Sequence, residues 1–244
     1  MSDQLYGGEA PQAKAKTPSL LEQIEGVFTA PRALFERLNK TPSWVPALIL
    51  AVVLGLVVAI AWGLKVDVDA MLRPMMEANP KIPADQVDNI IQMQSKFILP
   101  FGILGVLFGI PIVSLIAGLI NWGLGRGFTE PGAQAPTFLQ GLSAAIVPSL
   151  VRLPDTLIII AMCLLKSVGG HRPEQVAPTS LGYYIHVASP KVQALLYQLN
   201  PFIIANFVLA YLAMRHIVKA KPLGAAISVG IWICFVLMGV AFAK

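Results

Sequence analysis

The 244-residue chain is 56% hydrophobic and only 13% charged, whereas about 25% of the residues in a soluble domain are charged. This composition excludes an ordinary water-soluble domain. The net charge of +5 comes from basic residues scattered over the tail and loops without interleaved aromatic residues, so we expect no nucleic-acid partner and favour anionic lipid headgroups.

The N-terminal residues 1–18 are rich in Gly, Ala, Pro and Lys, a composition that predicts a mobile tail. The first long apolar run begins only at Trp44 and is not preceded by a basic, apolar and small-residue cleavage pattern. We therefore expect no removable signal peptide.

Residues 19–43 predict two short amphipathic helices at the membrane surface. Ser19 and Glu22 have the spacing of a capping box, and the second helix follows Pro31. The first helix is a candidate partner interface because its apolar residues recur at helical spacing: Leu20, Leu21, Ile24, Val27 and Phe28. Two interpretations stay open, since the helices could only seal the bundle from below or could dock a cytosolic partner.

Residues 44–243 predict a five-span membrane domain, and the fold class is therefore an all-α integral membrane protein. Each span is an apolar run long enough to cross the hydrocarbon region of a bilayer. The predicted spans cover residues 44–64, 97–122, 138–166, 199–217 and 223–243. A further helix over residues 83–97 is expected to lie on the outer surface and run into the second span.

The third span is the least regular, because Arg152 and Asp155 lie near its centre beside Pro148 and Pro154. A charge at mid-bilayer costs at least about 2.5 kcal/mol, so the two charged residues are a candidate intramembrane polar site. Their i,i+3 spacing allows them to pair. In the alternative, the prolines break the helix and Arg152 reaches back to the cytosolic headgroups.

Small residues mark candidate helix-packing faces in two spans. They are Gly102, Gly105 and Gly109 in the second span and Gly141 and Ala145 in the third. Close packing within one chain accounts for them, and association of copies into a homo-oligomer is the alternative.

The sequence contains no catalytic, metal-binding or cofactor-binding motif. An intramembrane aspartyl protease needs two membrane carboxylates, whereas Asp155 is the only carboxylate inside a predicted span. Cys163 and Cys234 also fall inside spans and predict packing residues, not a disulfide or a metal site. We expect no enzymatic activity, no metal and no cofactor.

Basic residues near the membrane give the orientation of the spans. With Arg152 set aside, nine lysine and arginine residues fall on one side and eight on the other. The total is nearly even, but Arg32, Arg37 and Lys40 flank the first span on the N-terminal side. We expect a cytosolic N-terminus.

Several short motifs, in order and spacing, resemble the prokaryotic branch of the Yip1-domain family over roughly residues 24–243. They include Val27-Phe28-Thr29-Ala30-Pro31-Arg32, Gly125-Arg126-Gly127-Phe128, Leu199-Asn200-Pro201-Phe202 and Lys219-Ala220-Lys221. The resemblance implies five spans, a cytosolic N-terminus, the cytoplasmic (inner) membrane and a non-enzymatic role. It also implies protein partners: eukaryotic relatives bind Rab-type GTPases, and some prokaryotic ones accompany ABC-type export machinery.

These observations favour a multi-pass scaffold or adaptor that organises a membrane protein complex, an ABC-type export system being one candidate. The alternative is a transporter, or a transporter subunit, that moves a small or lipid-like solute past Arg152 and Asp155.

Overall fold

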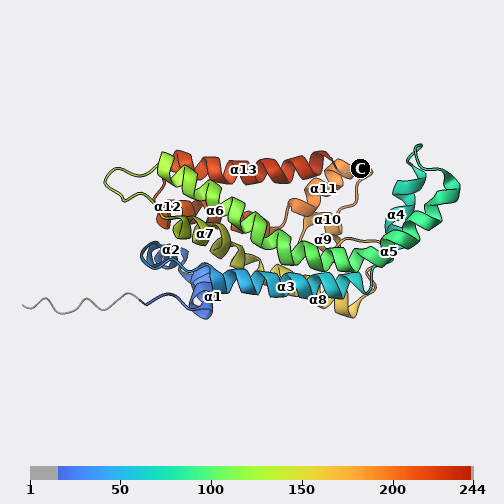
Figure 1. Cartoon of the computed structure of the whole chain (residues 1–244), viewed down its shortest axis with the longest axis horizontal. Helices are drawn as coiled ribbons and strands as arrows, with labels where there is room; N and C mark the ends of the chain where they lie inside the picture. Colours follow the sequence, from blue (N-terminus) through green and yellow to red (C-terminus); the bar gives the residue numbers. More distant parts are fainter. Residues whose placement is uncertain (1–15, 243–244) are drawn as a thin grey trace, which may run out of the picture.

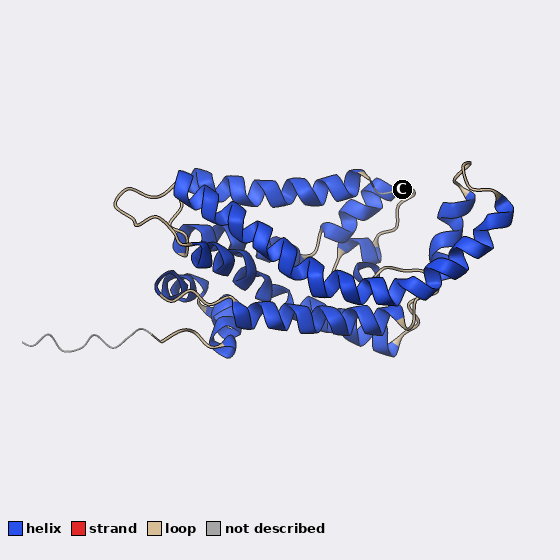
Figure 2. Ribbon diagram, viewed as in Figure 1, coloured by secondary structure: helices blue, strands red, loops and turns tan. Residues whose placement is uncertain are grey.

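The computed structural model describes residues 16–242, whose long elements are all helices (Figures 1 and 2). Most of the predicted mobile tail, residues 1–15, lies outside the described residues. The α-helices are α1 Leu20–Thr29, α2 Pro31–Lys40, α3 Val45–Gly63, α4 Val68–Glu77, α5 Val87–Leu104, α6 Ile110–Gly127, α7 Phe138–Ile146, α8 Leu153–Leu165, α9 Pro173–Val176, α10 Leu181–Tyr184, α11 Pro190–Gln198, α12 Pro201–His216 and α13 Pro222–Ala241.

The predicted all-α membrane fold is confirmed. Within residues 16–242, four helices are long and apolar enough to cross a membrane, and a fifth span is present if α11 and α12, which meet at a bend of 61°, count as one. The outer surface of the bundle is apolar, as lipid contact requires. On α3, for example, exposed side chains recur every three or four residues: Val45, Ile49, Val53, Val57 and Ile60.

The predicted second span, residues 97–122, lies within a longer helical rod of 44 residues over Ala84–Gly127. This rod joins a short 3₁₀ turn, α5, the π-helical turn η2 (Gly105–Gly109) and α6. Pro100 and Pro111 remove backbone N–H donors on either side of η2, and a π turn is a common way for a helix to absorb such a defect. The predicted outer helix does run into the span.

The helices α1 and α2 close one end of the bundle, opposite α4 and the start of α5 (Figure 1). Phe35 and Leu38 of α2 are fully buried in the main apolar core, which they share with α7, α12 and the start of α13. Asn39 ties α2 to the span ends: its Nδ2 donates to the Ile217 carbonyl at 2.6 Å, and its own carbonyl accepts from Gln140 Nε2 at 2.6 Å. The predicted seal is therefore packed into the bundle.

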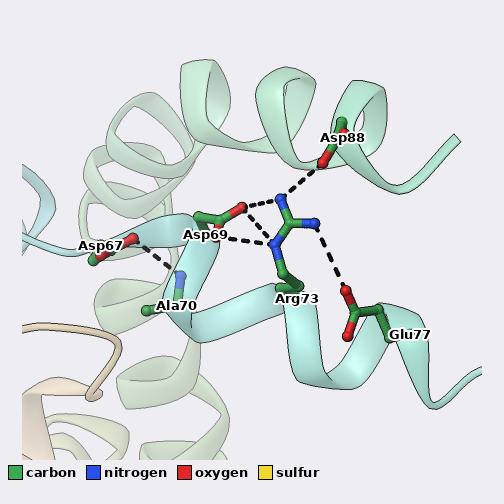
Figure 3. Close-up of polar contacts among 6 residues, drawn as sticks. All are labelled: Asp67, Asp69, Ala70, Arg73, Glu77 and Asp88. Atoms are coloured by element: carbon green, nitrogen blue, oxygen red, sulfur yellow. Dashed lines mark hydrogen bonds and ion pairs between the residues drawn. The ribbon is translucent and has the colours of Figure 1, made fainter. Parts of the chain in front are cut away.

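An ion cluster around Arg73 fixes the helical hairpin at the far end (Figure 3). The Arg73 guanidinium contacts Asp69 at 2.6 Å, Asp88 of α5 at 2.7 Å and Glu77 at 3.7 Å. Its hydrogen bond holds the pKa of Asp69 below the usual value, and the carboxylates raise the pKa of Arg73. Since the cluster is solvent-exposed, we expect it to add little stability, although Arg73 does link α4 to α5 through Asp88.

Candidate functional site

The candidate site lies where the third span breaks. Pro148 has no N–H to donate, and the helix narrows there into a 3₁₀ segment, η3 (Val147–Arg152), before α8 begins. Ser149 Oγ donates to the Ile146 carbonyl at 2.7 Å. The break leaves Asp155 in the first turn of α8, where the helix N-terminus favours a carboxylate.

Asp155 is 2% exposed and is held by two residues from distant parts of the chain. Thr179 Oγ1 donates to Asp155 Oδ1 at 2.6 Å, and Asn200 Nδ2 donates to the same oxygen at 3.0 Å. Asn200 also caps α12, since its Oδ1 accepts from the Phe202 N–H at 2.8 Å. One carboxylate thus joins the third span, the loop before α10 and the start of α12.

The structure places Arg152 and Asp155 close together, but Asp155 is buried and Arg152 is about half exposed. Their closest atoms, Arg152 Nη2 and Asp155 Oδ2, are 3.7 Å apart, and the Arg152 side chain is 46% exposed. At this distance the two side chains form an ion pair but no hydrogen bond. Asp155 therefore belongs to the protein interior, whereas Arg152 presents most of its donors elsewhere.

Arg152 and Asp155 line a partly open cavity of about 670 Å³ between the helices of the bundle. Its walls come from α3, α6, α7, α8, α12 and α13 together with the loop around Thr179. Most lining residues are apolar, with further polar groups at Asn121, whose Oδ1 accepts from Ser228 Oγ at 2.7 Å, and at Asn206. Asn206 Oδ1 is buried and has no hydrogen-bond partner in the described part of the chain.

The predicted interface residues of α1 do not share one face. Val27 is buried against the core, and Leu20 and Ile24 are partly buried. Leu21 and Phe28, seven residues apart and so on the same side of the helix, are 78% and 46% exposed. Helical spacing alone could not separate the two sets, because both consist of apolar residues.

The predicted helix-packing glycines fall into two groups, one in close contact with a neighbouring helix and one with open space beside it. An added Cβ at Gly141 would lie 2.6 Å from the Gly118 carbonyl oxygen, so α6 and α7 touch backbone to backbone there. Ala145, one turn further on, lines the cavity. By contrast, a Cβ at Gly105 or Gly109 would meet nothing within 4 Å, and one at Gly102 only the Ala59 side chain at 3.9 Å.

Thr179, Asn200 and Asn206 were missed by the sequence analysis. Asn200 could have been recognised as a helix cap, because Asn before Pro at the start of a span is typical of that position. No sequence pattern marks Thr179, since it lies in a polar loop. Within residues 16–242, no cluster of three or more His, Cys, Asp or Glu residues could hold a metal ion.

The fold and the enclosed polar network define a multi-span, α-helical integral membrane protein. Residues 26–243 match the family model of the Yip1 domain. The chain therefore belongs to the Yip1 domain family, which is known as a family of non-enzymatic membrane proteins. Searches of curated proteins and of solved structures found no significant match.

Proposed function

We propose that the protein is a non-catalytic scaffold or adaptor that organises a membrane protein complex through the outer face of α1. One observation supports this proposal: α1 is packed against the bundle, yet its side chains Leu21 and Phe28 are exposed. An exposed apolar pair on a rigid support suits a protein interface, because little conformational entropy is lost when a partner binds.

Two side chains of α1, Gln23 and Glu22, bind residues outside the helix. Gln23 is fully buried, and its Nε2 donates to Ser43 Oγ at 3.0 Å and to the Pro18 carbonyl at 3.1 Å. Ser19 and Glu22 form the predicted capping box, and Arg37 of α2 lies 3.3 Å from Glu22. The Ser19 N–H and, next, Arg37 hold the pKa of Glu22 below its usual value.

The partner class follows from the position of this surface and from the family. α1 lies beside the end of the bundle, so its partner has to reach the same membrane level. Another integral membrane protein, such as a subunit of an ABC-type export system, meets this requirement.

We expect the double variant Leu21→Ser, Phe28→Ser to lose crosslinked partners while its melting temperature stays close to that of the parent protein. Both side chains are exposed, and surface substitutions usually change stability by less than about 0.5 kcal/mol. The measurement is crosslinking in intact membranes followed by purification. Leu223→Ser, which alters an exposed leucine at the start of α13, is the matched control and should keep every partner. Retention of all partners by the double variant would overturn the proposal.

A second candidate function, transport of a small or lipid-like solute, is favoured by the cavity beside Arg152. Liposomes that contain this chain alone would have to show solute flux that depends on the protein. Copurification of stable protein partners without such flux favours the scaffold.

The proposed setting is the cytoplasmic membrane with α1 on the cytosolic side. In a variant without Cys163 and Cys234, single cysteines at the exposed positions Ala78 and Ala188 should react with an impermeant thiol reagent added to intact cells. A cysteine at Ala135, which is exposed in the loop between α6 and α7, should react only after the cells are permeabilised. The reverse pattern would invert the topology.

A further inference from the structure

The cavity has the two-part lining of a site for an amphiphile. One part is polar and is formed by Arg152 with the residues that hold Asp155. The other part is mainly apolar and is formed by side chains of α6, α12 and α13, among them Val113, Phe207 and Phe235. The same helices add a few polar groups, which are Ser114, Asn121, Asn206 and Ser228. A ligand with one charged end and one hydrocarbon end would satisfy both parts.

The charges in the lining indicate the sign of the ligand. Arg152 is the only basic residue among the lining residues, and Asp155 and Glu174 are the two acidic ones. Asp155 accepts two short hydrogen bonds from Thr179 and Asn200 and is nearly inaccessible. Glu174 is exposed on the short helix α9, in the loop. The guanidinium, with five donors, is therefore the charged group left to face a ligand within the bundle.

We propose that this cavity binds a single-chain lipid with an acidic headgroup, the head at Arg152 and the acyl chain among the apolar side chains. A guanidinium matches a phosphate or carboxylate with paired hydrogen bonds. A volume of about 670 Å³ falls within the range of sites that hold one small ligand, so we assign one acyl chain and not two. The proposal shares its cavity with the transport candidate but requires only binding, and it does not depend on α1.

Trp232 lines the same cavity and serves as the reporter. The purified full chain in detergent is titrated with brominated lysophosphatidylglycerol, whose bromine atoms quench nearby tryptophan. The uncharged, equally brominated monoacylglycerol is the matched probe. We expect saturable quenching that disappears in Trp232→Phe, with the acidic probe bound about tenfold more tightly, since hydrogen bonds to charged groups contribute differences of this size.

Arg152→Gln should bring the acidic probe to the affinity of the neutral one, whereas Arg152→Lys, which keeps the charge but not the paired hydrogen bonds, should keep only part of the preference. Lys191→Gln, on the exposed start of α11, is the control and should change nothing. If Arg152→Gln does not fold, Ala145→Leu tests the same cavity and should weaken both probes by reducing its volume.

Three results would overturn the proposal. They are equal affinity for the acidic and neutral probes, tighter binding of a brominated alkyl-ammonium probe, and displacement of the acidic lipid by glycerol phosphate as efficiently as by the unlabelled lipid. The last result would show an anion site that does not use the acyl chain. Binding without any liposome flux would leave the proposal intact while removing the transport function.

Discussion

Asp155→Ala is expected to lower the free energy of unfolding by about 2 kcal/mol, one of the two largest effects that we predict. The substitution removes a buried acceptor that serves Thr179 and Asn200 at once, and hydrogen bonds to a charged group contribute about 1.5–3 kcal/mol each. Because Asn200 Nδ2 also lies 3.0 Å from Thr179 Oγ1, part of the loss is recovered. Unfolding in detergent, followed by circular dichroism, measures the effect.

The matched variant is Arg152→Gln, which should cost far less because its guanidinium is half exposed and makes only a long contact to Asp155. The two residues therefore do not contribute equally to stability, although their i,i+3 spacing allows them to pair. Asp155→Asn, which keeps one acceptor oxygen, should fall between the two. Equal losses for Asp155→Ala and Arg152→Gln would contradict this assignment.

Gly141→Ala is expected to destabilise the bundle by about 2 kcal/mol, because its new methyl group would press on the Gly118 carbonyl and on the backbone nitrogen of Trp122, 3.0 Å away. Backbone atoms cannot move aside as a flexible side chain can, and overpacking of this kind typically costs about 1–3 kcal/mol. Thermal unfolding in the same detergent is the measurement.

Gly109→Ala provides the control for Gly141→Ala. It makes the same chemical change in a helical segment where the methyl group would meet no atom within 4 Å. Since alanine favours a helix over glycine by about 1 kcal/mol, this variant should be as stable as the parent or slightly more so. A large loss at Gly109 would indicate that this glycine face contacts another copy of the chain.

Much of the fold could be predicted because bilayer thickness and hydrophobicity determine where a span lies. For that reason the sequence identified the apolar run that begins at Trp44 and the charged residues within the third span. The bend between α11 and α12 and the π-helical turn η2 could not be predicted, since they depend on how neighbouring helices satisfy freed backbone groups.

The candidate site could be predicted only in part. Arg152 and Asp155 could be identified from the sequence because they are charged residues within an apolar run, where ionisable residues are rare. The partners of Asp155 come from residues 24 and 45 positions further along the chain, and nothing in local sequence reports a contact over that distance. The two faces of α1 were inseparable for a similar reason: which apolar face is covered depends on η3 and α2, against which α1 packs.

The rod over Ala84–Gly127 has a mechanical consequence. Its Gly127 end is fixed: α6 touches α7 at Gly118, the Phe128 carbonyl accepts from the Lys221 N–H just before α13, and Glu130 pairs with Arg215 of α12. Its outer end carries the hairpin that Arg73 stiffens (Figure 3). At 1.5 Å per residue the rod is roughly 65 Å long, and it contains the 3₁₀ turn at Ala84–Gln86 and, further along, the π-helical turn η2. Because α5 and η2 also pack against α3, a force on the hairpin would reach the bundle through α3 as well as through the crossing of α6 and α7.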